Sequence, residues 1–221
     1  MGPQRLTLDL DGAWCYRAIH GVDGGGADDD DDDDPVLLQG LPRFLDLCDR
    51  LGARATLFVV GRDLRRPRYR ALVKAAADAG HDVESHSYGH AYDLSRRPAA
   101  EIAADVGKSV AALVDAVGRA PRGFRAPGYN LSPALLDAVA AAGLSWSSSL
   151  LPSPAYFAAR ALVIARTALA GRRSASLVGD VRDFALRRQR HTNGLWEFPM
   201  SAPLGISLTG TTLALAGDAV A

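Results

Sequence analysis

The stretch RLTLDLD, residues 5–11, is the first strand of the fold that we predict for this chain. Its leucines alternate with polar residues, and this period of two is typical of a β-strand. The same period places Asp9 and Asp11 on one face, at the carboxyl end of the strand, where α/β folds carry their functional groups. Two neighbouring carboxylates repel each other unless a cation or a shared proton lies between them. The pair therefore suggests a metal site, although a polar edge strand that leads into a solvated turn would show the same pattern.

After this strand, predicted helices and strands alternate along the chain. The apolar run ATLFVVG is typical of a strand that is buried on both faces in a parallel sheet. Six strands separated by helices predict an α/β fold, either a parallel barrel or an open sheet. Further strands are predicted at residues 55–61, 81–87, 123–127, 144–149 and 195–201, and helices at residues 40–51, 67–79, 99–117 and 133–142 and in a segment that ends near residue 170.

Length and composition favour one domain that spans residues 1–221. The chain has 48% hydrophobic residues, enough for a sizeable core, and its 25 basic and 25 acidic residues give no net charge that would attract nucleic acid or an anionic membrane. Cys15 and Cys48 imply no disulfide framework and do not have the spacing of metal ligands. Neither a secretory signal nor a transmembrane segment is visible, so we expect a cytoplasmic protein.

A Gly-rich and acidic insertion at residues 23–35 contains seven consecutive aspartates, Asp28 to Asp34. Self-repulsion and the lack of apolar residues predict a disordered loop. As a strand-to-helix loop, it would lie on the same rim as Asp9 and Asp11. We therefore hypothesise that its negative field favours cationic substrates or products, or concentrates divalent metal.

His86 and His90 are spaced by four residues, which predicts that both lie on one side of a helical turn and can bind one ion. This spacing alone is a weak signal. It gains weight because His86 ends a predicted strand and should share a rim with Asp9 and Asp11. One carboxylate and two imidazoles leave coordination positions open for water and substrate, as a catalytic metal site requires.

The segment FRAPGYN, residues 124–130, places Arg125 at another predicted strand end. An arginine there can pair with a carboxylate. The backbone N–H groups of the turn at Gly128 can face a developing oxyanion. A surface arginine followed by a simple strand-to-helix connection is the alternative.

Five of these motifs together resemble the polysaccharide deacetylase family, whose members remove N- or O-acetyl groups from saccharides. TLDLDGAW, ATLFVVG, HDVESHSYGH, RAPGYN and WEFPMS occur in the order and approximate spacing of that family. The resemblance implies an α/β fold of the deformed (β/α) barrel type and a bound divalent metal, zinc in the first place, with cobalt or manganese as alternatives. It implies Asp11, His86 and His90 as metal ligands, Asp9 as the general base, Arg125 as the residue that orients Asp9, and the N–H of Gly128 as part of the oxyanion hole.

The chain also departs from the family pattern. The carboxylates of the first motif are separated by one residue, and residues 144–149 carry no acid where many members have an aspartate, which predicts weaker support for Arg125. The family's late general-acid histidine does not appear before Ala221, which suggests a barrel that is incomplete at its C-terminus.

We therefore predict a metal-dependent hydrolase that removes acetyl groups from an N-acetylated or O-acetylated saccharide by metal-activated water. The alternatives are a catalytically impaired metal- or glycan-binding member of the fold, and an amide hydrolase that acts on non-peptide C–N bonds of a small substrate.

Overall fold

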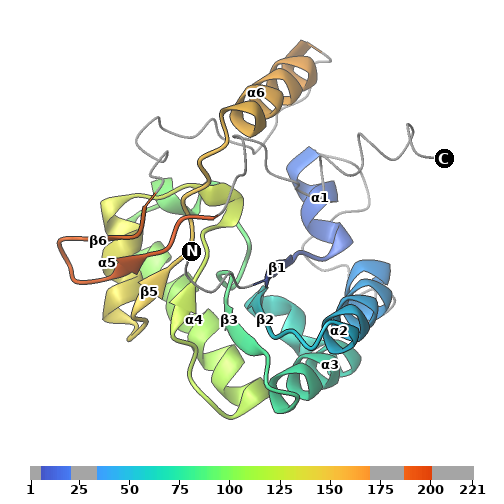
Figure 1. Ribbon diagram of the computed structural model, residues 1–221. Coiled ribbons are helices and arrows are strands. Elements are labelled where there is room, and N and C mark those ends of the chain that lie inside the picture. The colour runs from blue at the N-terminus through green and yellow to red at the C-terminus, as the bar shows by residue number, and fades with distance from the viewer. Residues whose placement is uncertain (1–5, 21–33, 170–186, 201–221) are drawn as a thin grey trace.

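A seven-stranded sheet forms the centre of the computed structural model, which describes residues 6–20, 34–169 and 187–200 (Figure 1). The strand order is β1-β2-β3-β4-β5-β7-β6, and every neighbouring pair except β6 and β7 is parallel. The predicted α/β class with a parallel sheet is therefore confirmed. The strands are β1 (Leu6–Leu10), β2 (Ala55–Val59), β3 (Asp82–Ser85), β4 (Gly123–Phe124), β5 (Trp146–Ser147), β6 (Gln189–Arg190) and β7 (Trp196–Glu197).

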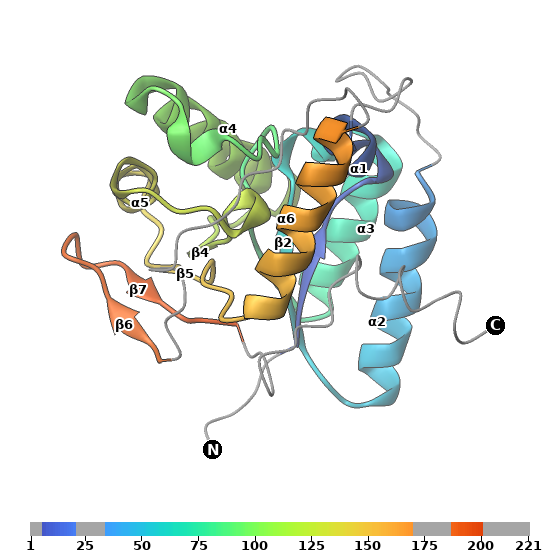
Figure 2. The same ribbon diagram turned by 90° about the horizontal axis from the view of Figure 1, so that it is seen from above.

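Helices α2 to α5 lie along the outer side of the curved sheet, whereas α6 lies over the end where the site is built (Figure 2). Within the described residues the sheet does not close into a barrel, because β1 pairs only with β2. The sequence analysis did not predict α1 or β6. The helices are α1 (Ala13–His20), α2 (Leu41–Arg50), α3 (Pro67–Asp78), α4 (Ala99–Val117), α5 (Pro133–Ala141) and α6 (Pro154–Leu169), joined by a π-helical turn (Val36–Gly40) and by short 3₁₀ helices (Gly61–Arg65, Leu94–Arg96 and Pro127–Tyr129).

No helix in the described part of the chain has the length and apolar character needed to cross a membrane.

Helix α4 joins two hydrophobic clusters. Its Leu113 packs in a cluster with the buried strand β2, and its Ile102 and Val106 pack with Phe124 of β4. The helix ends at Gly118, whose left-handed conformation (φ 80°) lets its N–H donate to the carbonyl of Val114. One long helix thus ties the first half of the sheet to the second, and it fixes the relative positions of the strand ends.

The last part of the predicted insertion belongs to the folded structure. The carboxylate of Asp34 accepts hydrogen bonds from the N–H of Ala13 (2.7 Å) and from the N–H of Val36 (2.9 Å). Asp34 is buried, and Pro35 is helical, so the predicted disorder is wrong for these two residues. The reason is that two backbone N–H groups near helix ends compensate for burial of the carboxylate. The rest of the insertion lies outside the described residues, so its prediction as a disordered loop stays a prediction.

Gly123 packs directly against the ring of Trp146. A Cβ atom at residue 123 would lie well inside van der Waals distance of three ring atoms of Trp146. That ring contacts Phe58 and Phe198 edge-to-face, with centroid distances of 5.9 and 6.1 Å. We expect Gly123→Ala to lower the free energy of unfolding by about 2–3 kcal/mol, because the methyl group displaces the ring from both aromatic partners. Urea-denaturation midpoints measure this change.

Gly107→Ala is the matched control. Gly107 lies exposed in the interior of α4, and an added Cβ there meets no atom within 4 Å. The control should raise the free energy of unfolding by about 0.5–1 kcal/mol, because alanine is the better helix former. A Gly123→Ala protein as stable as the wild type would contradict the tight packing of Trp146.

Candidate metal and active site

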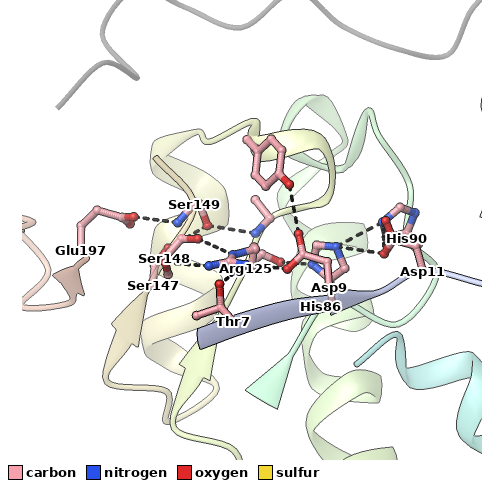
Figure 3. A network of polar contacts seen from close by, with 12 residues as sticks. Thr7, Asp9, Asp11, His86, His90, Arg125, Ser147, Ser148, Ser149 and Glu197 are labelled. Carbon is pink, nitrogen blue, oxygen red and sulfur yellow. Dashed lines mark hydrogen bonds and ion pairs between the residues drawn. The ribbon is translucent and has the colours of Figure 1, made fainter. Parts of the chain in front are cut away.

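Asp11, His86 and His90 converge just beyond the ends of β1 and β3. Oδ1 of Asp11 lies 3.3 Å from Nε2 of His86 and 3.1 Å from Nε2 of His90. The two imidazole Nε2 atoms are 3.3 Å apart. Both imidazoles are buried, and the Asp11 side chain is 15% exposed. The structure therefore brings together, around one point, all three residues that the sequence analysis selected as metal ligands (Figure 3).

The histidine pair does not lie on a helical turn, so that part of the prediction is wrong. Residues 86–90 form a bend in which Ser87 (φ 63°) and His90 (φ 50°) have left-handed backbone conformations. Oγ of Ser87 accepts a hydrogen bond from the N–H of His90 (3.0 Å), which stabilises the bend. The side chains still meet because the bend, rather than a helix, returns His90 toward His86.

The donor atoms of this group fit a divalent cation. Nδ1 of His86 donates a hydrogen bond to the carbonyl of Arg125 (2.7 Å), because a carbonyl can only accept. Nε2 of His86 is thereby left to face Asp11, whose Oδ1 is buried and has no hydrogen-bond partner among the described residues. Ligands at about 2.1 Å from a tetrahedral zinc ion lie about 3.4 Å apart, close to the separations found here. A cation, or a proton on an imidazole, must balance the buried carboxylate.

Electrostatics agree with this need for positive charge. Burial raises the pKa of the Asp11 carboxyl, but the His90 and His86 imidazoles outweigh burial and hold this pKa well below its usual range. Burial likewise lowers the pKa of His86, yet the contact with Asp11 outweighs it and raises this pKa above its usual value. The site thus strongly favours an ionised carboxylate beside a positive partner.

Asp9 belongs to a second, adjoining group. Its Oδ1 forms an ion pair with Nη1 of Arg125 (2.6 Å), and its Oδ2 accepts a hydrogen bond from the hydroxyl of Tyr129 (3.1 Å). Nη1 of Arg125 also lies 3.3 Å from Oγ1 of Thr7. The predicted contact between Arg125 and Asp9 is therefore present, whereas sequence reasoning missed Tyr129. Tyr129 has a left-handed backbone conformation (φ 62°), which could not be predicted from the sequence.

The expected weakness in the support of Arg125 is not found. Nε of Arg125 donates to the carbonyl of Ser148 (2.7 Å), and Nη2 donates to Oγ of Ser148 (2.9 Å). The guanidinium also lies over the ring of Phe58, 4.0 Å from its centroid. Ser148 therefore supports Arg125 with two acceptors, one of which is its main-chain carbonyl.

Glu197, at the end of β7, fixes the loop that carries Ser148. Its Oε1 accepts hydrogen bonds from the N–H of Ser149 (2.7 Å) and of Leu150 (3.1 Å), and the residue is fully buried. Oγ of Ser149 in turn accepts from the N–H of Ala126 (2.9 Å), next to Arg125. A chain of hydrogen bonds thus runs from the last strand to the arginine that contacts Asp9 (Figure 3).

Gly128 lies in the turn after β4, in the left-handed region (φ 59°). Its carbonyl accepts a hydrogen bond from Nη1 of Arg160 on α6 (2.6 Å). A Cβ atom at this position would come within 2.6 Å of the Tyr92 ring and 2.9 Å of the Arg160 guanidinium, so only glycine fits. Helix α6 therefore contacts the peptide that follows the one whose N–H the sequence analysis selected for the oxyanion hole.

Cys15 is the residue that sequence reasoning set aside and the structure brings to the site. Its Sγ, a carboxylate oxygen of Asp11 and a ring nitrogen of His90 all lie within 4.8 Å of one another. Burial raises the pKa of the Cys15 thiol well above its usual value, and the charges of Asp11 and Asp63 raise it further. The available signal was the spacing of four between Asp11 and Cys15, which becomes informative only when a helix is known to begin at Ala13.

Asp63, in the 3₁₀ helix after β2, is hydrogen-bonded to the first turn of α1. Its Oδ1 accepts hydrogen bonds from Nε1 of Trp14 (2.9 Å) and from Nη1 of Arg66 (2.9 Å). Burial raises the pKa of Asp63 from its ordinary value of 3.8 to about 6, against the opposing effects of Arg66 and of the Trp14 hydrogen bond. A carboxyl group that keeps its proton more tightly in the folded state stabilises the fold at low pH.

The raised pKa of Asp63 predicts a pH dependence of stability. Well below pH 3.8 the group is protonated in both states, and its full contribution is present. As the pH rises from 3.8 to about 6, the unfolded state ionises first, so stability relative to Asp63→Asn should fall, by a total of order 3 kcal/mol, and then level off. Urea denaturation of both proteins at several pH values, with chelator present, measures the difference. Asp115→Asn is the control of opposite sign, because Arg70 lowers the pKa of this exposed carboxyl and its contribution to stability is lost, rather than gained, at low pH. A flat difference curve for Asp63→Asn would contradict the prediction.

The protein is an α/β domain whose polar site lies at the carboxyl ends of parallel strands. The sequence model of the family described as polysaccharide deacetylase matches residues 30–146, just over half of the chain. The chain therefore belongs to the polysaccharide deacetylase family.

Individual relatives agree with this assignment. A peptidoglycan deacetylase of Helicobacter pylori (strain ATCC 700392 / 26695) is 30% identical over 112 residues, which cover 51% of this chain and 37% of that protein. An Arthroderma benhamiae protein named as a peptidoglycan-N-acetylglucosamine deacetylase is 34% identical over 100 residues, which cover 44% of this chain and 23% of that protein. The matched residues thus span well under half of the length of these curated relatives.

Solved structures show the same fold. A Mycobacterium smegmatis protein described as a polysaccharide deacetylase superposes with a TM-score of 0.60 at 21% identity, over 89% of this chain and 58% of that chain. A protein of Bacillus anthracis, described as a pseudoenzyme of carbohydrate esterase family 4, superposes with a TM-score of 0.50 at 17% identity, over 75% of this chain and 50% of that chain. At such identities the likeness concerns the fold alone, and the second structure shows that this fold does not by itself guarantee activity.

Proposed function

We propose that this chain is a metal-dependent hydrolase that removes acetyl groups from an N-acetylated or O-acetylated saccharide. The observation that carries the proposal is the meeting, at the ends of β1, β3 and β4, of an Asp11–His86–His90 group with an Asp9–Arg125 ion pair. The first group has the donor atoms of a divalent-metal site, and the second provides a carboxylate that is not itself required as a ligand. Family membership supports deacetylation as the reaction.

Asp11, His86 and His90 are the proposed ligands of the cation, with zinc preferred and cobalt or manganese as alternatives. When bound, such a cation supplies Lewis acidity, which polarises an acyl carbonyl and lowers the pKa of water. Three protein ligands leave positions open for water and substrate, as in catalytic rather than structural zinc sites.

Asp9 is the proposed general base. Arg125 and Tyr129 each contact one of its carboxylate oxygens, which fixes the orientation of the carboxylate while leaving a lone pair on each oxygen to accept a proton from the attacking water. The N–H of Gly128 is the proposed donor to the developing oxyanion, and Arg160, which donates to the carbonyl of Gly128, holds the same residue in place. Arg125 and Arg160 are therefore positioning residues in this proposal.

The test is release of acetate from chitooligosaccharides and from aryl acetates. Protein that has been treated with a chelator should be inactive, and added Zn²⁺ or Co²⁺ should restore turnover. Acetate release that is unaffected by thorough removal of metal would overturn the metal-dependent mechanism. Saccharide binding without acetate release from any substrate would instead favour the alternative of an impaired, glycan-binding member of the family. Turnover of small cyclic amides alone would favour the alternative of a non-peptide C–N hydrolase.

A further inference from the structure

Asp105 of helix α4 is hydrogen-bonded to the bend that carries both histidines of the candidate metal site, residues 86–90. Its Oδ1 accepts a hydrogen bond from the N–H of Tyr88 (2.8 Å), and its Oδ2 accepts one from the N–H of Gly89 (2.9 Å). Successive backbone N–H groups that converge on one anion form a nest, a concave binding arrangement of the main chain. Both oxygens of this half-buried carboxylate therefore bind residues that lie between the two histidines.

The bend has a backbone conformation that needs such support. Ser87 (φ 63°) and His90 (φ 50°) are both in the left-handed region, which residues other than glycine rarely adopt. The N–H of Gly61 donates to the carbonyl of Ser87 (2.9 Å), and the N–H of Arg62 donates to the carbonyl of Tyr88 (3.0 Å). The segment after β2 thus holds the carbonyl groups of the bend, whereas Asp105 holds its N–H groups.

The imidazole of His90 depends on its backbone more than that of His86 does. Nδ1 of His86 donates to the carbonyl of Arg125 (2.7 Å), and this bond orients the ring. Nδ1 of His90 is buried and has no hydrogen-bond partner among the described residues. The His90 ring makes edge-to-face contacts with Tyr92 (centroid distance 5.3 Å) and Trp14 (6.4 Å). Such contacts are less directional than a hydrogen bond, so the bend itself must place His90.

We propose that Asp105 is a positioning residue for the metal site, and that its carboxylate holds residues 86–90 in the conformation in which His90 faces Asp11 before any cation is bound. This inference rests on the proposed function, because it concerns the same cation. Asp105 acts through the backbone and supplies no donor atom, so the positions for water and substrate stay open. A ligand that is already in place loses less conformational freedom when the cation binds, and Asp105 therefore raises the metal affinity.

Asp105→Asn tests the proposal through metal binding rather than activity. Asparagine keeps one acceptor oxygen but presents an amide nitrogen, which is a donor, to the second N–H of the bend. The metal-free variant should bind Co²⁺ and Zn²⁺ about 10–100-fold more weakly than the wild type, in calorimetric titrations at a temperature at which both proteins are fully folded. At saturating Co²⁺ its visible absorption should match that of the wild type, because the same three ligands hold the ion. A merely structural role would leave the affinity of the folded protein unchanged.

Asp115→Asn is the matched control, because it removes the same charge from the same helix. Asp115 pairs with Arg70 (2.6 Å) and lies roughly 15 Å further along α4 than Asp105. At 0.1 M salt a charge at such a separation is largely screened, so this variant should bind Co²⁺ within about twofold of the wild type. Equal affinities in Asp105→Asn and Asp115→Asn would overturn the positioning role and leave the proposed function standing.

Hydrogen exchange of the wild type gives a second test, which holds even if Asp105→Asn fails to fold. In metal-free protein the N–H groups of Tyr88 and Gly89 should be protected from exchange, since both are bonded to Asp105 without a cation. Free exchange of both groups until Zn²⁺ is added would show that the cation orders the bend, and it would overturn the inference alone. Absence of Co²⁺ and Zn²⁺ binding by folded wild-type protein would overturn the proposed function as well.

Discussion

Asp9→Asn should lower kcat for acetate release by about a thousandfold while leaving metal affinity nearly unchanged. Asp9 contacts Arg125 and Tyr129 rather than the Asp11–His86–His90 group, so its replacement removes the proposed proton acceptor and not a proposed ligand. General-base catalysis contributes about 10²–10⁴-fold in enzymes, which sets the expected size. Asparagine has nearly the same shape, and its amide oxygen can still accept from Arg125. Steady-state kinetics together with a metal titration measure the two effects separately.

Tyr129→Phe is the companion variant, because it removes a single hydrogen bond to Asp9 and keeps the carboxylate. It should retain far more activity than Asp9→Asn. Wild-type turnover in Asp9→Asn would remove Asp9 from the mechanism, and a parallel loss of metal affinity would indicate that Asp9 is a ligand instead of a base.

The part of this site that the sequence predicted depends on one topological rule. The alternation in residues 5–11, the apolar run in residues 55–61 and the intervening helices indicate a parallel sheet, and the carboxyl ends of parallel strands meet at one edge. Asp11, His86 and Arg125 each follow or end a predicted strand. Their location at one edge of the sheet could therefore be predicted without knowledge of any contact, whereas the pairing of Arg125 with Asp9 was implied only by the family resemblance.

The contacts that escaped prediction are those in which side-chain identity carries little information. Ser148 supports Arg125 partly through its main-chain carbonyl, which every residue has. Hydropathy alone would place Trp196 inside and Glu197 outside, yet Trp196 is 40% exposed and Glu197 is fully buried. Two backbone N–H groups in the loop after β5 compensate for burial of Glu197, and that loop lies 48 residues away from Glu197 in the sequence. Pairings over such distances leave no local pattern.

His86→Ala should abolish acetate release and weaken metal binding by at least about 100-fold. Replacing a residue that only hydrogen-bonds to a metal ligand already costs about 10–100-fold in metal affinity, and loss of a ligand should cost more. His86 has two roles in the structure. Its Nε2 faces Asp11 and His90, whereas its Nδ1 donates to the carbonyl of Arg125. Alanine removes both, so it also leaves that buried carbonyl without its donor, at a cost of about 1–3 kcal/mol in stability. Calorimetric metal titration and urea denaturation report these two losses.

His86→Asn separates the two roles. The amide nitrogen of asparagine can occupy the place of Nδ1 and donate to Arg125, but no atom replaces Nε2. This variant should therefore recover most of the lost stability and none of the metal affinity. His191→Ala is the control histidine, since its Nε2 lies near Glu197 (3.6 Å) and away from Asp11, and it should bind metal as the wild type does. If His86→Asn bound metal like the wild type, the imidazole would be a structural support for Arg125, and the hydrolase proposal would lose its metal centre.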